Sequence, residues 1–332
     1  MNREQKEMQF LGVYGILKES YKIILTCQKI FTQITLALIL PLSLVFLANI
    51  QISELLFSDI VGNTVVRDDT PAGTQNYKNL SDLLSSEWTV FWLFKLVYFI
   101  FVLIFSLLST SAVVYTIASI YTGRDVTFQR VMSVVPRVWK RLMITFFAIF
   151  VLIFCYIFIA VLVIVIFIIS LSSTKILVPI SIALLIVFIS GLVYLSVVWQ
   201  LATVVSVLED ACGFQAMKKS RNLLRGKMGV AVAIFIKLGI SQLVTLAVFE
   251  KLFVHGDSLG LVSRGVLGVL CLALVVKLFL LVRVVQTVLY LVCKSYHHEN
   301  VDKSILSDHL EVFHGEYVPL KEKDVQLEHV YV

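Results

Sequence analysis

Charged residues are scarce in this chain: Lys, Arg, Asp and Glu together account for 15% of its 332 residues. Soluble globular proteins carry about a quarter of their residues as charged side chains. No polar stretch is long enough to fold as a separate domain, so the sequence excludes a soluble catalytic domain fused to the apolar part. With 59% hydrophobic residues and a mean hydropathy of +0.92, the chain is predicted to be a membrane protein.

Cysteine is also rare, and its spacing excludes two kinds of site. The five cysteines are Cys27, Cys155, Cys212, Cys271 and Cys293. None of the Cys-x-x-Cys or Cys/His spacings that hold zinc occurs among them. All five fall in apolar runs or on the side of the membrane that we assign to the cytosol, where thiols stay reduced. We therefore expect no disulfide, no metal site and no cofactor.

Long apolar runs are what the chain has in place of polar segments. A helix needs about 20 apolar residues to cross a hydrocarbon core about 30 Å thick. Six runs meet this length, at 30–52, 88–122, 142–169, 176–208, 228–253 and 262–293. They predict an all-α fold, a polytopic membrane helix bundle with six transmembrane helices.

Polar segments complete the predicted organisation. Residues 1–29 are predicted to be a cytosolic N-terminal amphipathic segment, 30–293 the transmembrane domain, and 294–332 a cytosolic hydrophilic tail. Within the domain, residues 53–87 are predicted to form an outer loop, because acidic residues outnumber basic ones there and a Thr-Pro-Ala-Gly sequence in it is typical of a turn. Asn79 begins an Asn-Leu-Ser sequon in this loop and is a candidate glycosylation site.

Lysines and arginines set the predicted orientation. Nineteen of the 28 lie beside the spans on the side of both termini, and five lie on the opposite side. Cytosolic loops carry such an excess, so both termini are assigned to the cytosol. The net charge of +6 belongs to this pattern. We expect no nucleic-acid partner, because that reading needs a basic face on a soluble domain. Long spans suit the plasma membrane, and tilted spans would also suit the endoplasmic reticulum.

Apolar residues recur at helical spacing just before the first, third and fifth spans. The three sets are Phe10, Tyr14, Leu17, Tyr21 and Ile24; Phe128, Val131, Val135, Trp139 and Leu142; and Phe214, Met217, Leu223 and Leu224. Each opposite face is basic. We predict three cytosolic amphipathic interfacial helices. The repeated order of one such helix and two spans predicts a threefold internal repeat.

The third amphipathic segment carries a basic cluster. Its cations are Lys218, Lys219, Arg221, Arg225 and Lys227. The cytosolic leaflet is negatively charged, and each nearby Lys or Arg contributes about 1 kcal/mol of attraction to it. We therefore take this cluster as a candidate site for anionic lipid, with membrane topology alone as the alternative explanation.

Other cations lie inside the predicted spans. Lys237, Lys277 and Arg283 occupy apolar runs, where a central charge costs about 2.5–3.5 kcal/mol on insertion scales. Because carboxylate partners are missing nearby, these three could line a cavity that accepts an anion or a lipid phosphate. The alternative is that they face the bundle interior or a span end, or extend to the interface as Lys95 could.

The connection between the fourth and fifth spans carries a motif. It reads Glu-Asp-Ala-Cys-Gly-Phe-Gln-Ala-Met-Lys-Lys-Ser-Arg-Asn-Leu-Leu-Arg-Gly-Lys over 209–227. It resembles the signature of the glycerophosphoryl diester phosphodiesterase membrane-domain-like family, and the Phe-rich spans look most like its uncharacterised plant multi-pass branch. The motif residues are Glu209, Ser220, Arg225 and Gly226. The resemblance implies no catalytic residue here, because in fused relatives the phosphodiester chemistry belongs to a separate soluble domain.

Three functions remain open on this sequence. A non-catalytic membrane organiser, in trafficking, lipid organisation or protein assembly, is favoured by basic interfacial helices that come without recognisable chemistry. The alternative is a transporter or channel for an anion or lipid, which the repeat and the intramembrane cations favour. An enzyme is not predicted, because the spans offer no acid-base pair or activated nucleophile. The expected partners are membrane lipids, anionic ones included, and cytosolic proteins that bind the tail.

Overall fold

The computed structural model describes residues 9–71, 73–123, 126–170, 174–254 and 260–297. All regular structure in these ranges is helical, as predicted. The α-helices are α2 (Val13–Thr26), α3 (Gln28–Ile34), α4 (Leu40–Asp68), α5 (Gln75–Tyr121), α6 (Phe128–Ser170), α7 (Thr174–Leu208), α8 (Phe214–Leu223), α9 (Met228–Phe249) and α10 (Leu261–Tyr296). Six helical segments are long and apolar enough to cross a membrane, at Gln28–Asp68, Gln75–Tyr121, Val138–Phe167, Pro179–Leu208, Met228–Val254 and Val262–Tyr296. The chain is therefore a helical membrane protein, and the prediction of six spans is confirmed.

A short π-helix, Thr35–Ile39, interrupts the first of these segments between α3 and α4. Pro41 lies at the start of α4 and has no N–H with which to bond the carbonyl group of Ala37. A π-turn inside an α-helix is a local adjustment of the hydrogen-bond ladder. We attribute the interruption to this proline. A second π-helix, Glu250–Val254, follows α9.

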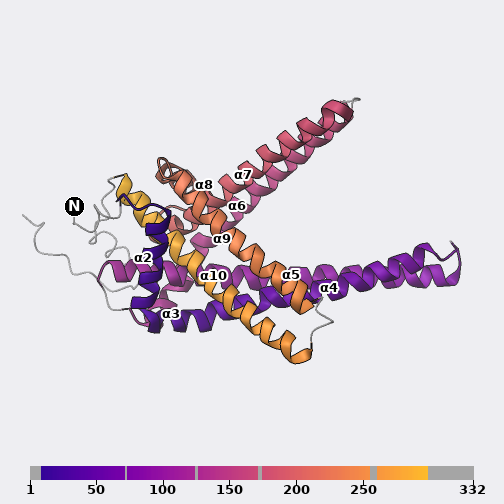
Figure 1. The fold of residues 1–332 in the computed structure, drawn as a ribbon, viewed down its shortest axis with the longest axis horizontal. Coiled ribbons are helices and arrows are strands. Elements are labelled where there is room, and N and C mark those ends of the chain that lie inside the picture. The colour runs from indigo at the N-terminus through magenta and orange to yellow at the C-terminus, as the bar shows by residue number, and fades with distance from the viewer. Residues whose placement is uncertain (1–8, 72, 124–125, 171–173, 255–259, 298–332) are drawn as a thin grey trace, which may run out of the picture.

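Three helical hairpins make up most of the molecule: α4–α5, α6–α7 and α9–α10. The two helices of each hairpin lie side by side, and the three hairpins diverge from one end of the molecule (Figure 1). The small helices α2 and α8 lie at the end from which the hairpins diverge. The α4–α5 hairpin extends furthest from that end.

The α4–α5 hairpin corrects one predicted boundary. We expected an outer loop over 53–87, but α4 continues to its end at Asp68 and α5 begins at Gln75, so only residues 69–74 separate the helices. Polarity alone does not distinguish a loop from a hairpin whose polar side chains pair with each other. Here Asn63 Nδ2 donates to Glu87 Oε1 at 2.7 Å. Asn79 is therefore an exposed residue of a helix.

The three amphipathic segments do not form three separate helices. The first and third are separate, as α2 and α8. The second begins at Phe128 and continues without a break into the third span as α6, through Pro136. The amphipathic segment is a separate helix in two of the three units and is continuous with the span in the other. This difference does not test whether the units arose by duplication, so the threefold repeat stays a prediction.

The predicted apolar face of α2 is only partly buried: Leu17 and Ile24 pack against the core, whereas the two tyrosines face outward. Ile16 and Ser20 are fully buried, whereas Tyr14 and Tyr21 are 78% and 54% exposed. Helical spacing identifies apolar residues on one side, but in a membrane such a side can face lipid as well as protein. In α8 the predicted Met217 is buried.

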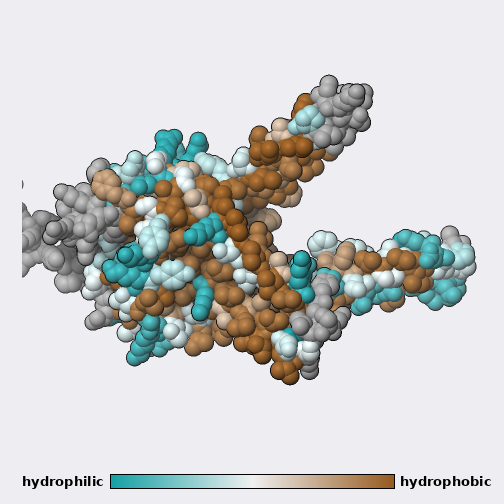
Figure 2. All heavy atoms as spheres, in the orientation of Figure 1, coloured by the Kyte–Doolittle hydropathy of each residue, from teal (hydrophilic) through white to brown (hydrophobic). Residues whose placement is uncertain are grey.

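Buried side chains are concentrated where α2 and α8 lie. We call this region the hub; it consists of α2, α3, α8 and residues 107–121, 128–149, 197–208 and 281–296 of the long helices. The outer parts of α6 and α7, residues 150–167 and 179–196, contain no buried side chain, and we call them the α6–α7 arm. In Figure 2, hydrophilic residues gather over the hub and the far end of the α4–α5 hairpin, while the described part of the α6–α7 arm is mainly hydrophobic.

Candidate functional site

Glu209 directly follows α7 and is the centre of an ionic network in the hub. Its Oε2 pairs with Lys219 Nζ of α8 at 2.5 Å, and its Oε1 accepts a hydrogen bond from Lys294 Nζ of α10 at 3.1 Å. Oε1 also accepts one from the hydroxyl group of Tyr290 at 2.5 Å. Only 11% of the Glu209 side chain is exposed. One carboxylate therefore joins α7, α8 and α10, and we call these four residues the Glu209 network.

The charge of Glu209 is stabilised by its neighbours. Burial raises the pKa of its carboxyl group, because desolvation disfavours the charged form, but hydrogen bonds from Lys219 and Tyr290 and the attraction of Lys294 outweigh it. The resulting pKa lies below the ordinary value of 4.5. At neutral pH the carboxylate is ionised and occupied by three donors, so it acts as an acceptor that holds helices together.

Hydroxyl groups bond α8 to two further helices. Gly213, with φ +60° in the left-handed region that favours glycine, precedes α8, and its N–H donates to Thr145 Oγ1 of α6 at 2.9 Å. Thr145 Oγ1 also lies 2.7 Å from Ser206 Oγ of α7. Ser220 Oγ of α8 donates to the backbone carbonyl of Val198 at 2.8 Å. The position of α8 is thus fixed on both α6 and α7.

The end of α10 closes over the segment that follows α8. His297 Nε2 lies 3.1 Å from the carbonyl oxygen of Arg225. Gly226 has φ +88°, and a Cβ added there would lie 2.7 Å from Tyr296 Cε1, so glycine meets both the backbone and the space requirement. Lys227 Nζ lies 5.4 Å from the centre of the Tyr296 ring. We call the place where α7, α8 and the end of α10 meet the junction. All four motif residues named from the sequence, Glu209, Ser220, Arg225 and Gly226, lie in it.

The other cations of α8 and of the turn that follows it point away from the hub interior. Lys218, Arg221 and Arg225 are exposed, and none of them has an ion-pair partner among the described residues. Lys218 and Lys219 line a hollow of about 400 Å³ together with Asn222. The ammonium groups of the two lysines and the amide of Asn222 can donate hydrogen bonds at the edge of this hollow, and such donors bind phosphate or carboxylate.

The predicted cavity shared by three intramembrane cations is not formed. Lys237 is exposed on α9 and lines a groove with α2. Lys277 is exposed on α10. Arg283 Nη2 donates instead to Ser106 Oγ of α5 at 2.7 Å. Lys237 thus lies beside α2 and Arg283 beside α5, which sequence position within an apolar run does not reveal.

Gln286, one helical turn after Arg283, is fully buried. Neither its amide nitrogen nor its amide oxygen has a hydrogen-bond partner among the described residues. A buried amide without partners costs about 1–3 kcal/mol. This side chain is the clearest unsatisfied polar group in the interior of the hub.

Lys95 stays within the α4–α5 hairpin and does not extend to an interface. Its Nζ donates to Asn49 Oδ1 at 3.1 Å and to Ser53 Oγ at 2.5 Å, and it lies 5.3 Å from the centre of the Phe91 ring. Polar partners on the neighbouring helix are the usual solution for a cation inside a membrane. Lys95 therefore links α5 to α4 through hydrogen bonds.

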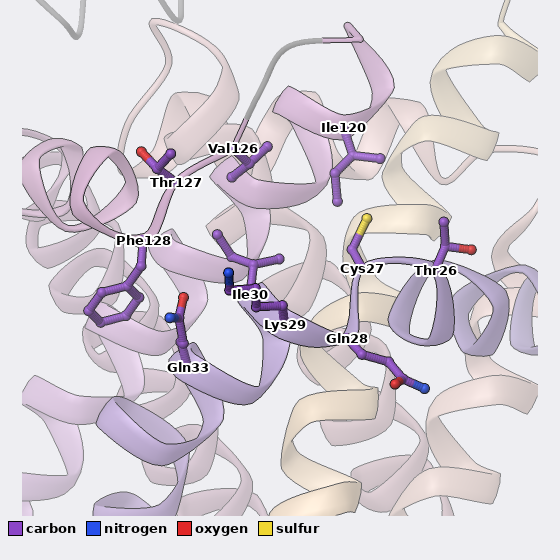
Figure 3. Close-up of a pocket in the computed structure, with 10 residues that line it drawn as sticks. All are labelled: Thr26, Cys27, Gln28, Lys29, Ile30, Gln33, Ile120, Val126, Thr127 and Phe128. Carbon is purple, nitrogen blue, oxygen red and sulfur yellow. The ribbon is translucent and has the colours of Figure 1, made fainter.

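A further hollow, of about 610 Å³, lies where α2 and α3 meet the end of α5 and the start of α6. Figure 3 shows Lys29 and Gln33 of α3 around it, with Phe128 from the other side and the Cys27 thiol at the junction of α2 and α3. No carboxylate is among its lining residues, so within the described residues it offers no acid-base pair. Similarly, no group of three His, Cys, Asp or Glu able to hold a metal ion occurs in the described ranges.

Comparison with known proteins places the chain in a family. The family model of a domain of unknown function, DUF8558, matches residues 1–330. The chain belongs to this family. No curated protein and no solved structure matches it. The DUF8558 match spans the hub, the three hairpins and the tail together. The resemblance of 209–227 to the glycerophosphoryl diester phosphodiesterase membrane-domain-like family stays a prediction.

Sequence reasoning named Glu209 but missed two of its partners, Tyr290 and Lys294. They lie 81 and 85 residues away along the chain. One signal was present: Tyr290 and Lys294 are four residues apart, so they share a helix face at the end of the last span, and Glu209 ends the fourth span on the same side of the membrane. Polar side chains at the ends of two spans that finish on the same side of the membrane are candidates for a direct contact.

Proposed function

We propose that this protein is a non-catalytic membrane organiser that gathers anionic lipid around its hub. The hub would lie at the cytosolic leaflet, with both termini in the cytosol, in the plasma membrane or the endoplasmic reticulum. The proposal joins the function predicted from the sequence to the geometry of α8.

The division of the α8 cations carries the proposal. Lys219 is used internally, where it neutralises Glu209. Lys218 and Arg221 stay exposed on α8 and Arg225 stays exposed just after it, and α8 is fixed in place by Ser220 and by the Glu209 network. A rigidly held row of exposed cations at the membrane surface loses little conformational entropy when it binds lipid headgroups. The same network supplies the Glu209 carboxylate with three donors, so the role that we assign to it is structural.

Lipid enrichment around the reconstituted protein tests this proposal. We expect spin-labelled phosphatidylserine to be immobilised at the protein in preference to phosphatidylcholine, and the preference to weaken at high salt. Exchange of Lys218, Arg221 and Arg225 for Gln together should remove most of the preference. The matched control exchanges Lys78 and Lys251, exposed cations outside the hub, and should leave it unchanged. Equal immobilisation of both lipids by the unaltered protein would contradict the proposal.

A transporter or channel for an anion or lipid is the second candidate function. The observation that favours it is the pair of Arg283, whose one partner among the described residues is Ser106, and the buried, unpartnered Gln286. Intramembrane polar groups of this kind mark transport pathways in other proteins. Flux of chloride, phosphate or labelled phospholipid across proteoliposomes, lost in Arg283→Gln and Gln286→Leu, would establish this function in place of the organiser.

The orientation has a separate test at Asn79. This residue is exposed near the start of α5, far from the hub. If the hub faces the cytosol, Asn79 faces the compartment in which glycosylation occurs. A glycosidase-sensitive shift in gel mobility that is absent in Asn79→Gln would support the orientation. A sequon introduced into the loop 209–213 that is glycosylated instead would reverse it.

Partner binding through the tail is the remaining part of the proposal. The segment 298–332, which contains four of the six histidines of the chain, lies outside the described residues, so its support is its hydrophilic sequence alone. Comparison of the location of the full chain and of a chain that ends at His297 tests it. An unchanged location and unchanged co-purifying proteins would remove the tail from the proposed function.

A further inference from the structure

A groove of about 640 Å³ separates α2 from the middle of α9. Its walls come from two helices that are far apart in sequence, and its volume is in the range of small-ligand sites. The side chains that line it are Tyr14, Leu17, Lys18, Tyr21, Lys22, Leu25, Thr26 and Lys237. The groove therefore combines three ammonium groups, two phenol rings and a short apolar stretch.

Lys237 is the least expected member of this set. It lies about 14 Å along α9 from the first residue, Met228, given 1.5 Å of rise per residue. Its neighbours on the same exposed side are apolar: Ile236 and Ile240 are 43% and 56% exposed. An exposed lysine among lipid-facing side chains needs a counter-charge or access to the interface. No ion-pair partner for its ammonium group is found among the described residues.

The charge balance of the groove is positive. Lys18 and Lys22 of α2 are exposed. Glu19 lies 3.7 Å from Lys22 Nζ, with 71% of the lysine side chain and 36% of the glutamate side chain exposed. A surface pair at that distance contributes little. Lys18 and Lys237 have no such partner among the described residues, so the groove is complementary to an anion.

The apolar residues of the groove indicate what carries that anion. Tyr14 and Tyr21 are 78% and 54% exposed, and Leu25 is 63% exposed. Tyr side chains favour the level of lipid headgroups, where the ring contacts hydrocarbon and the hydroxyl group contacts water. Leu25 adds an apolar wall beside the lysines. Inorganic phosphate would use the lysines alone, whereas a phospholipid would use both parts.

We propose that the groove between α2 and α9 is a specific site for one anionic glycerophospholipid of the leaflet at the hub end. Its phosphate-bearing headgroup lies between Lys18, Lys22 and Lys237, and an acyl chain follows Leu25 and the exposed side of α9. This inference rests on the proposed function, since it places one defined lipid beside the diffuse enrichment at α8. It also assigns Lys237 to α2 rather than to a cavity with Lys277 and Arg283.

The closing experiment is a lipid titration of the purified full-length protein, followed by native mass spectrometry. The probes are dioleoylphosphatidylserine and dioleoylphosphatidylcholine. We expect the first bound molecule to be phosphatidylserine, with its affinity lowered about fivefold by Lys237→Gln and further when Lys18→Gln and Lys22→Gln are added. Lys237→Arg should keep the affinity. The matched control Lys277→Gln changes another exposed lysine of the spans and should have no effect.

Two results would overturn the site. One is equal affinity of the two lipids for the first binding step; the other is equal loss in Lys237→Gln and Lys277→Gln. Loss of general enrichment with the α8 triple variant, together with an unaltered first binding step, separates the two proposals. If the groove result fails while the α8 result stands, only the groove is wrong. If the α8 result fails while the groove result stands, the organiser proposal fails alone.

Photocrosslinking identifies the occupant directly. Tyr21→benzoylphenylalanine places a photoreactive ring in the groove of the full chain, where the native side chain is also aromatic and exposed. In vesicles of phosphatidylcholine and phosphatidylserine we expect an adduct with the mass of phosphatidylserine. An adduct with residues 298–332 or with a second copy of the chain would overturn the proposal, because the groove would then hold protein.

Discussion

The two parts of α7 consist of similar apolar residues but have opposite surroundings. Leu201, in the hub, is fully buried, whereas Leu185, in the α6–α7 arm, is 50% exposed. Both lie in one helical segment that is long and apolar enough to cross a membrane, Pro179–Leu208. In lipid, an apolar side chain gains little by leaving hydrocarbon for protein, so apolarity does not decide which part of a helix is packed. What decides it is how closely the neighbouring helices can approach.

The two parts of α5 show what allows close approach. The hub part carries small side chains, all buried: Ser109, Thr110, Ser111, Ala112, Thr116, Ala118 and Ser119. The part nearer the hairpin turn carries large aromatic ones instead, such as Trp88 and Trp92, which are 40% and 65% exposed. Small residues let helix backbones pack closely in membranes, and their hydroxyl groups bond locally or across helices. Side-chain size along a span therefore separates hub from lipid-facing surface better than hydropathy does.

The largest expected difference between hub and arm is in packing. Leu201→Ala should lower the free energy of unfolding by about 2–5 kcal/mol, because it leaves a cavity among close-packed helices. Leu185→Ala, the same change on the same helix, should stay within about 0.5 kcal/mol. Thermal unfolding in one detergent, followed by tryptophan fluorescence, gives both values. Equal losses would mean that the arm is packed in solution.

The next effect concerns the Glu209 network. Glu209→Gln removes the charge that holds Lys219 and Lys294 and should cost about 2 kcal/mol of unfolding free energy, less than a fully buried pair because Lys219 is partly exposed. The matched control is Asp210→Asn. Asp210 pairs with Arg141 at 2.6 Å but has 64% of its side chain exposed, so its loss should cost under about 1 kcal/mol. The same unfolding assay decides, and a larger loss in the control would refute this ranking.

Acid should weaken the hub through the same carboxylate. The pKa of Glu209 is lower in the folded chain than its ordinary value of 4.5, so its contribution to stability is fully present above about pH 4.5. That contribution is lost as the pH falls through the lowered pKa, because the unfolded chain binds the proton more readily than the folded chain does. Melting temperatures measured from neutral pH downward should fall more steeply in the unaltered chain than in Glu209→Gln. Parallel curves would show that another group dominates the acid response.

The smallest effect is expected from a single hydroxyl group. Ser220→Ala removes the hydrogen bond to Val198 and should cost about 1 kcal/mol. Ser133→Ala is its control, because Ser133 is exposed and its hydroxyl group bonds only within α6, to the carbonyl of Arg130. Hydrogen exchange of the α8 amides should rise in the first variant alone. Faster exchange in both would point to a general loosening of the hub.

Much of the fold could be predicted from the sequence, because each span is a local run of apolar residues. The prediction failed at 53–87, where polar composition indicated a loop. There Asn63 and Glu87 bond to each other across the hairpin, and polar residues remain helical as a result. The π-helix at Thr35–Ile39 is a local feature as well, since we attribute it to the nearby Pro41.

The candidate site was harder to predict because its contacts are not local. The motif fixed attention on Glu209, Ser220 and Gly226, and all three lie in one junction. Their partners come from other helices. The sequence alone does not show which helices lie next to each other, so it does not show these contacts. Lys237 shows this most clearly: its position in an apolar run suggested a common cavity with Arg283, whereas its actual neighbours are on α2.

The separation of hairpins and hub also orders events during synthesis, which proceeds from the N-terminus. In the α6–α7 arm the Tyr156 ring stacks on Phe188 at 5.5 Å, and its hydroxyl group donates to the Phe188 carbonyl, 32 residues on. This hairpin can pair as soon as α7 has left the ribosome. The hub must wait for α10, which brings Tyr290 and Lys294 to Glu209. A ribosome that stalls before α10 would therefore leave hairpins that are already paired around a hub without the donors of Tyr290 and Lys294.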